Sequence, residues 1–312
     1  MNVVDHLRQV KSPLVSFEII PPERGSNIRD LLSVVEELVR YQPPFIDVTS
    51  HAAELVGVVT DEGTIQKPLR KRPGTVGLCA LLQHKYHVDA VPHVLCDGFT
   101  REETEDFLLE LSYLGIDNVL ALRGDTKYQK PTPILKTTNT SAVDLVRQIA
   151  ALNRGEYLSS SRQGSSTQFS IGVAGYPEKH AEALDLATDI SYLKKKIDAG
   201  ASYIVTQMFF DNCDYFSFVD QCRAVGITVP IIPGLKVLTS QKQVETLPRS
   251  FAISLPDALR QEIEKAEPRY CAEIGVEWTV QQIKELRSRG VAATHLYVMQ
   301  NVKPIHEVMK RL

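Results

Sequence analysis

The chain has 312 residues, and its hydrophobic content of 43% and charged content of 23% are close to those of globular proteins. At about 150 residues per domain, this length allows two ordinary domains or one large α/β barrel. The formal net charge is −3, from 35 basic and 38 acidic residues, and no long block of like charge occurs, so nucleic-acid binding is not indicated.

The five cysteines are scattered and form no CxxC pair, which argues against a disulfide framework, a zinc ribbon and an iron–sulfur cluster. His84 and His87 have no matching ligand pair at metal spacing, so we expect no metal site and place both on the surface. The N-terminal segment lacks the apolar core of a signal peptide, and no apolar run reaches the roughly 18 residues that cross a bilayer. We therefore expect a cytoplasmic protein that contains no membrane segment.

Short apolar or β-branched runs alternate with helical patterns along the chain, which is typical of βα units and a parallel sheet. The predicted strands are residues 14–20, 45–49, 90–96, 118–123, 169–174, 203–208, 228–233 and 293–299. Most are almost continuously apolar, as strands covered on both faces are. About eight such units, with an extra N-terminal helix, predict a single (β/α)8 TIM barrel over residues 1–312. The alternative, an open doubly wound sheet, normally carries a GxGxxG motif, and none occurs here.

The helices between these strands carry their own start and stop signals. Thr100 and Glu103 form a capping-box pattern, and Gly115 stands where the residue after a helix end belongs. The same order of strand, helix and glycine recurs before Gly200 and Gly226. This repetition favours one barrel over two domains.

Two segments lack periodicity. Residues 154–167 are rich in serine and glycine, and we expect a mobile loop without function at the N-terminal face of the barrel. Residues 125–140 follow a predicted strand, so we expect them on the catalytic face, in a position to cover a ligand.

Polar residues stand at several predicted strand ends, where a TIM barrel carries its chemistry. Glu18 lies inside an apolar strand, where burial would raise its pKa and make it a general acid, or where it is a structural carboxylate bonded to a neighbouring segment. His93 is either a satisfied core histidine or a site residue. The Arg123-Gly124-Asp125 run is either a turn with an internal ion pair or a close backbone approach to a phosphate or flat ring.

Two further features have open interpretations. Asp189 and Lys196 lie on one helix face that borders the buried stripe, and a solvated helix edge explains them equally well. Gln207, at a strand end, is a two-way hydrogen-bonding group suited to an amide-like heterocycle, or it bonds to the barrel backbone.

Taken together, the motifs resemble those of the methylenetetrahydrofolate reductases. In chain order they are SFE at 16–18, PP at 21–22, VPH at 91–93, ALRGD at 121–125, YPEKH at 176–180, DAGA at 198–201, TQMFFD at 206–211, IPG at 232–234 and HLY at 295–297. The resemblance implies a (β/α)8 barrel that holds FAD. It also implies reduction of 5,10-methylenetetrahydrofolate to 5-methyltetrahydrofolate by NADH or NADPH, in alternate half-reactions at one FAD. We further expect a homo-oligomer.

The same resemblance assigns roles to individual residues. It implies that Glu18 is the general acid that protonates a folate nitrogen, and that Asp125 supplies negative charge beside the flavin and the pterin. The implied substrate contacts are Glu18, Asp125, Gln207 and Tyr297. The implied FAD contacts are Thr49, His93, Leu122, Arg123, Gly124, Asp125, Ala142, Tyr176, His180, Asp189 and Lys196.

The sequence departs from the family pattern after Pro233-Gly234. There the family usually continues with a proline and, further on, an aromatic residue that stacks on the bound substrate or nicotinamide. This chain has Leu235, Lys236 and Val237, and Gln241 further on, so the sequence does not identify a stacking residue. Ser141 also stands where an aromatic residue is common.

Two other functions remain open on the sequence alone. One is a barrel flavoprotein of the proline-dehydrogenase type, which would also bind FAD. The other is a catalytically inactive subunit that binds folate or flavin within a larger complex. The presence of Glu18, Asp125 and Gln207 favours the reductase.

Overall fold

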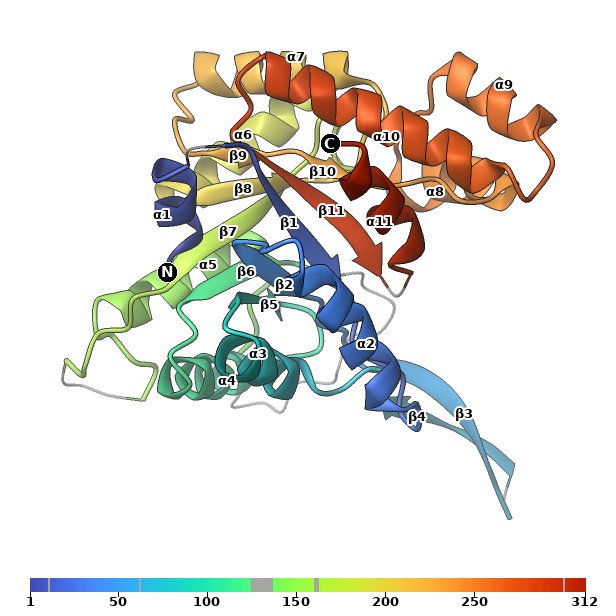
Figure 1. Ribbon diagram of the computed structural model, residues 1–312. Helices are drawn as coiled ribbons and strands as arrows, with labels where there is room; N and C mark the ends of the chain where they lie inside the picture. The colour runs from blue at the N-terminus through green and yellow to red at the C-terminus, as the bar shows by residue number, and fades with distance from the viewer. Residues whose placement is uncertain (11, 62, 125–136, 160–162, 300) are drawn as a thin grey trace.

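Parallel strands form the centre of the protein, and helices surround them (Figure 1). The computed structural model describes residues 1–10, 12–61, 63–124, 137–159, 163–299 and 301–312. The strands of the central sheet are β1 Leu14–Ile19, β2 Phe45–Val48, β5 Asp89–Leu95, β6 Asn118–Leu122, β7 Ser170–Gly175, β8 Tyr203–Thr206, β9 Ile231–Ile232, β10 Gly234–Leu235 and β11 Ala293–Met299. The helices are α1 Val3–Arg8, α2 Ile28–Val39, α3 Thr75–Lys85, α4 Arg101–Tyr113, α5 Ala142–Asn153, α6 Leu186–Asp198, α7 Asn212–Ala224, α8 Gln241–Phe251, α9 Asp257–Lys265, α10 Cys271–Ser288 and α11 Lys303–Lys310.

The central sheet closes into a ring at Pro233. Its strand order is β10-β11-β1-β2-β5-β6-β7-β8-β9, with β9 paired to β8 and β10 paired to β11. Because β9 and β10 flank Pro233, which has no backbone N–H to donate, they occupy one position as a broken strand. The described residues thus form the predicted (β/α)8 TIM barrel, and the strand predicted over 228–233 is shorter than expected.

Apolar side chains fill the barrel interior away from the C-terminal strand ends. Strand residues alternate between this interior and the helix-covered outside. Phe45, Val91 and Tyr203 belong to one buried cluster that fills the inside. Their strand neighbours Ile46 and Ile204 belong to the larger cluster under the helices. Polar residues therefore lie at the C-terminal ends of the strands, beyond this apolar cluster.

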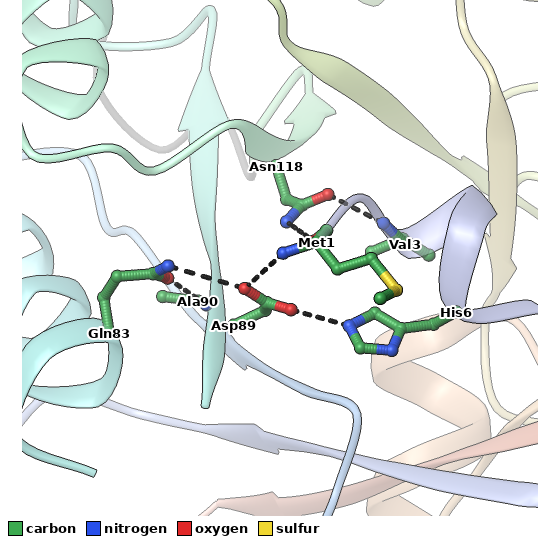
Figure 2. A network of polar contacts seen from close by, with 7 residues as sticks. All are labelled: Met1, Val3, His6, Gln83, Asp89, Ala90 and Asn118. Carbon is green, nitrogen blue, oxygen red and sulfur yellow. Dashed lines mark hydrogen bonds and ion pairs between the residues drawn. The ribbon is translucent and has the colours of Figure 1, made fainter. Parts of the chain in front are cut away.

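Helix α1, the predicted extra N-terminal helix, closes the opposite end of the barrel. Val3 is fully buried, and its backbone N–H donates to Asn118 Oδ1 over 2.8 Å (Figure 2). Asp89 accepts a 2.8 Å hydrogen bond from the Met1 amine and lies 2.6 Å from His6 Nε2 (Figure 2). These contacts seal the end of the barrel that faces away from the strand termini used for chemistry.

A long β-hairpin, which the sequence analysis did not predict, projects from the barrel after β2 (Figure 1). Strands β3 Glu54–Thr60 and β4 Gly63–Leu69 pair only with each other in the described structure. Leu55, Val59 and Ile65 are 47%, 84% and 51% exposed. Because neither face is buried, the alternation of polar and apolar residues that marks a half-buried strand is absent.

The outer helices follow the predicted signals. The Thr100 capping box is present, with Thr100 Oγ1 accepting from Glu103 N over 3.2 Å, and Gly115 has a left-handed φ of 66° just after the helix. His84 and His87 are exposed, as predicted. Among the described helices, none combines the length and apolarity that a bilayer crossing requires.

The two segments without periodicity are described only in part. Residues 154–167 connect α5 to β7, and Gly164 N donates to Gly155 O over 2.8 Å. Residues 160–162, within that segment, lie outside the described residues, and its expected mobility stays a prediction. Most of the segment predicted to cover a ligand, residues 125–136, also lies outside them.

Candidate active site

A cavity of about 960 Å³ opens at the C-terminal ends of the barrel strands, the place where TIM barrels carry their chemistry. The predicted site residues that line it are Glu18, Thr49, His93, Leu122, Arg123, Gly124, Tyr176, His180, Gln207 and Tyr297. Three others, Ala142, Asp189 and Lys196, are buried but do not line the cavity. Asp125 lies outside the described residues. The fold therefore brings most of the predicted set to one mouth.

Glu18 is a buried carboxyl group at the end of β1. It is 8% exposed, and its Oε2 lies 3.4 Å from His93 Nε2. Burial raises the pKa of Glu18 to about 7, because desolvation outweighs the lowering by His93 and Lys236, and Asp47 raises it further. Burial also lowers the pKa of His93, so the imidazole is mainly neutral at pH 7. A carboxyl group with this pKa can both hold and release a proton near neutrality.

Asp47 is a further buried carboxyl group beside Glu18 and His93, and it does not line the cavity. It pairs with Glu18 in the register of β1 and β2, and its Oδ2 lies 3.6 Å from His93 Nε2. Burial raises the pKa of Asp47 well above 3.8, which favours the neutral acid. In the described part of the chain, both Asp47 oxygens, His93 Nε2 and His295 Nε2 lack hydrogen-bond partners. His93 is therefore not the satisfied core histidine of the alternative interpretation. No set of three His, Cys, Asp or Glu side chains among the described residues could hold a metal ion.

Tyr297 is fixed at the cavity wall by a close approach of three strands. Its hydroxyl donates to Thr206 O over 2.6 Å, and Gly234 N donates to Thr206 Oγ1 over 2.9 Å. A Cβ at Gly234 would lie 2.2 Å from Thr206 O and 2.6 Å from the Tyr297 hydroxyl. Only glycine therefore permits this arrangement.

Gln207 follows β8 and reaches the cavity wall. Its Oε1 accepts a 2.9 Å hydrogen bond from the backbone N–H of Met208, the next residue. This is a bond to the backbone, as in the second interpretation of Gln207. Gln207 also lines the cavity, so its side-chain amide lies at the wall that a bound heterocycle would face.

Arg123 and Gly124 form one side of the cavity at the end of β6. Arg123 makes two hydrogen bonds to Glu182, of 2.6 Å and 2.9 Å. Asp125, its partner in the turn interpretation, lies outside the described residues. Gly124 has a φ of 101°, and a Cβ there would lie 3.1 Å from Asp97 Cβ. Glycine at this position therefore accommodates both the left-handed backbone and the close approach of Asp97, beside the cavity that Gly124 lines.

Asp189 and Lys196 on α6 are 9% and 7% exposed, so the solvated helix edge is wrong for both. Asp189 Oδ2 accepts from His180 N over 2.9 Å, and Lys196 Nζ donates to Ala174 O over 3.0 Å. Burial lowers the pKa of Lys196 to about 8, although the charge of Asp189 raises it. These residues support the wall that His180 and Ala174 form. The amphipathic pattern placed Asp189 and Lys196 at the edge of the apolar face of α6, and the packing of α6 on the barrel buries that edge.

The cavity is also lined by residues outside the predicted site, and Phe251 and Lys236 are two that could contact a ligand. Gln241 Nε2 donates to Ala266 O over 2.9 Å and Gln241 does not line the cavity. Phe251, at the end of the same helix α8, does line it and is 38% exposed. Lys236, directly after β10, also lines it. In the sequence, Lys236 is a charged residue three positions after the end of the strand predicted over 228–233.

Comparisons with known proteins give a consistent family assignment. The model of the family described as methylenetetrahydrofolate reductase matches residues 3–312. The chain is 30% identical to "Methylenetetrahydrofolate reductase (NADH) 1" of Arabidopsis thaliana, over 96% of this chain and 48% of that protein. It is 28% identical to "5,10-methylenetetrahydrofolate reductase" of Salmonella typhimurium, over 96% of this chain and 90% of that protein.

The lengths of these relatives differ. The chain spans about half the length of the plant protein, and 43% of a "Probable methylenetetrahydrofolate reductase (NADPH)" of Caenorhabditis elegans, with 29% identity over 99% of this chain. Among solved structures, an uncharacterized protein from Clostridium thermocellum that binds two copies of 5-methyl-5,6,7,8-tetrahydrofolic acid has a TM-score of 0.57. It is 12% identical and covers 98% of this chain and 96% of its own, which shows a shared fold.

Proposed function

The chain belongs to the methylenetetrahydrofolate reductase family, and we propose that it reduces 5,10-methylenetetrahydrofolate to 5-methyltetrahydrofolate with electrons from NADH or NADPH passed through FAD. The observation that carries this proposal is the buried Glu18 carboxyl, which lines the cavity at the barrel mouth and has a pKa of about 7. The similarity to the Salmonella reductase over 96% of this chain and 90% of that protein supports it.

Glu18 is the proton donor in this proposal. The five-membered ring that bridges two folate nitrogens must open before the bridging carbon can accept hydride, and protonation of a folate nitrogen makes that opening feasible. The O–H bond of Glu18 breaks, an N–H bond forms on the folate, and a C–N bond of the ring breaks to leave a cationic iminium carbon. His93 lies beside the carboxyl, Asp47 pairs with Glu18 in the strand register, and desolvation in the barrel interior keeps the proton affinity of Glu18 high.

The residues of the cavity fit FAD. Arg123 at the cavity wall and Lys196 behind that wall would provide two cations for a diphosphate, and Gly124 lines the cavity beside Arg123. The residues that would contact FAD from the cavity wall are Thr49, His93, Leu122, Tyr176 and His180. The residues that would support this wall from the buried side are Ala142, Asp189 and Lys196. When bound, FAD supplies hydride transfer between the nicotinamide and the folate.

Three further residues complete the proposed site. Gln207 would hydrogen-bond the pterin or the nicotinamide when each binds in turn, and Tyr297 would contact the substrate from β11. Asp125, outside the described residues, would favour the cationic folate intermediate by its negative charge. We also assign the protein to the cytoplasm, as a homo-oligomer; its five cysteines are all free, as in reduced compartments.

The experiment that tests the function separates the two half-reactions. The purified protein, with FAD added if needed, is mixed anaerobically with NADH or NADPH, and bleaching of the flavin absorbance is followed. The reduced protein is then mixed with methylenetetrahydrofolate, which should restore the absorbance and yield 5-methyltetrahydrofolate. Failure to bind FAD, or no reoxidation by the folate, would overturn the proposal.

The same measurement distinguishes the alternatives. Reduction of the flavin by proline without reoxidation by methylenetetrahydrofolate would select the proline-dehydrogenase type. Binding of folate and flavin without any turnover would select an inactive subunit.

A further inference from the structure

Lys236 is a lysine inside the candidate active site that has no role in the reaction as proposed above. It follows β10, whose residues Gly234 and Leu235 pair with His295 and Leu296 of β11. Lys236 therefore continues alongside Tyr297, and its Nζ donates to Tyr297 O over 3.0 Å. This bond holds the ammonium group at the level of Tyr297 along the barrel axis.

Glu18 lies at that same height on the other side of β11. The register of β1 and β11 pairs Glu18 with Tyr297, and Lys236 directly follows β10 on the other side of β11. Both Glu18 and Lys236 line the same cavity. A carboxyl group and an ammonium group thus share one largely desolvated space.

The charges around the pair come from both sides. Glu18 is faced by His93 from β5, Asp47 from β2, Tyr297 from β11 and Lys236. Burial lowers the pKa of His93 and raises those of Asp47 and Tyr297, so it disfavours the charged form of all three groups. Lys236 is the lysine that faces this cluster, and the charge of Glu18 raises its pKa against the lowering by burial.

Desolvation brings the two groups into the same pH range. Burial lowers the pKa of Lys236 from 10.5 to about 8, and burial raises that of Glu18 from 4.5 to about 7. Near pH 7, therefore, the protonation of the carboxyl depends on whether its neighbour carries a charge. A surface lysine, fully hydrated and screened, would not have this influence.

We propose that Lys236 is a positioning residue that acts through Glu18: its ammonium group, held by Tyr297 O at the level of the carboxyl, controls how readily Glu18 releases its proton to the substrate. The inference rests on the reductase function proposed above. The cation favours the carboxylate that remains after proton transfer to the folate nitrogen. No additional reactant is needed, because the proton that Glu18 donates is regained from solvent before the next turnover.

The test titrates Glu18 directly in the purified protein labelled with ¹³C at the side-chain carboxyl of glutamate. The Glu18 resonance is assigned by its loss in Glu18→Gln. In Lys236→Met the carboxylate loses its cationic neighbour, so the resonance should titrate at a pH higher by roughly 0.5 to 1 unit than in the wild type. Lys236→Arg keeps the charge and should titrate close to the wild type.

The matched control is Lys242→Met, an exposed lysine on α8 that does not line the cavity, which should leave the Glu18 titration unchanged. Circular dichroism and thermal melting verify folding, and Lys236→Gln replaces the methionine variant if that variant does not fold. An unchanged Glu18 titration in the folded neutral variant would overturn the inference.

The second readout is the pH dependence of each half-reaction. The folate half-reaction should lose rate at a higher pH in Lys236→Met than in the wild type, by the same shift, while the pH profile of flavin reduction by the nicotinamide stays in place. A shifted resonance with an unshifted folate profile would show that Lys236 does not control proton release. If the wild type does not turn over methylenetetrahydrofolate at all, the proposed function fails, and this result is separate from the carboxyl titration.

Discussion

His93 approaches Glu18 to 3.4 Å, Nε2 to Oε2, although neither charge is stable at that depth in the barrel. Burial raises the pKa of Glu18 to about 7 and lowers that of His93, so desolvation drives both groups towards their neutral forms. The contact therefore favours a carboxylic acid beside a neutral imidazole over a buried ion pair. This arrangement keeps a proton available at the cavity without a buried ion pair.

Glu18→Gln should remove the folate half-reaction selectively. The amide fits the same space but cannot donate a proton of comparable acidity, so the rate of reoxidation by methylenetetrahydrofolate should fall by about 10²- to 10⁴-fold. Stopped-flow reduction by NADH or NADPH should keep its wild-type rate. In the wild type, the folate half-reaction should weaken as the pH rises through about 7, because Glu18 then loses the proton it donates.

The matched control for this variant is Glu37→Gln, at a half-exposed position on α2 outside the cavity. It should alter neither half-reaction. Equal loss of both half-reactions in Glu18→Gln would contradict a general-acid role and indicate damage to the flavin site instead.

The sequence predicted the barrel because its buried strands are local apolar runs, and Glu18 was found because an ionisable residue inside such a run is conspicuous. The cluster around Glu18 depends on more than local pattern. Asp47 lies two residues before Thr49 on the same strand run, so the two side chains point to the same, inner face of the barrel. The approach of Asp47 to His93, however, requires the register of β1, β2 and β5. Register across strands far apart in the sequence is set by the packing of the whole barrel.

Phe251 and the β3–β4 hairpin escaped prediction for different physical reasons. The position of Phe251 depends on how α8 packs against α9 and α10 through residues such as Val244 and Leu259, and this tertiary contact has no local signature. The hairpin has two exposed faces, so its residues lack the polar–apolar alternation that reveals a half-buried strand.

Asp47→Asn should change the pH dependence of stability. Burial raises the pKa of Asp47 in the folded protein, so the folded state holds a proton that the unfolded state releases above about pH 4. Between that pH and the folded pKa, this group lowers the unfolding free energy of the wild type by about 1.4 kcal/mol per pH unit. Asparagine does not titrate, so the variant should gain stability relative to the wild type as the pH rises.

Urea unfolding at a series of pH values from 4 to 8 measures this difference. The gap between the two proteins should widen steadily with pH up to the folded pKa of Asp47. A constant gap across the series would mean that Asp47 is ionised in the folded barrel and that the desolvation argument is wrong. Asp198→Asn, on the exposed side of α6, is the control and should give no widening gap.

Lys196→Met should weaken FAD binding. The buried ammonium group behind Tyr176 and Ala174 is proposed to serve the diphosphate, and a charge-assisted hydrogen bond of this kind is worth a loss of about 10- to 100-fold in affinity. Flavin fluorescence during titration of the apoprotein with FAD measures the dissociation constant. Lys195→Met, at the exposed neighbouring position, should bind FAD as the wild type does. Equal affinities of the two variants would remove Lys196 from the cofactor site.

Phe251→Ala should raise the KM for the folate and for the nicotinamide with little change in the rate of the chemical step. Phe251 is the half-exposed aromatic residue of α8 that lines the cavity, whereas Gln241 bonds to the backbone at Ala266. Stacking on a flat ring contributes to ground state and transition state alike, so its loss should raise KM by about 3- to 10-fold and leave kcat nearly unchanged. Steady-state kinetics with each substrate varied in turn would show this.

Two comparison variants make the Phe251 prediction specific. Phe251→Tyr keeps an aromatic face and should retain a KM near that of the wild type, while Tyr113→Ala removes an aromatic ring that is 81% exposed on α4 and should change neither parameter. If Phe251→Ala lowered kcat and left KM unchanged, the ring would act on the reaction rather than on binding. An effect on one substrate only would mean that the folate and the nicotinamide do not occupy the same side of the cavity, against the alternate use of one site.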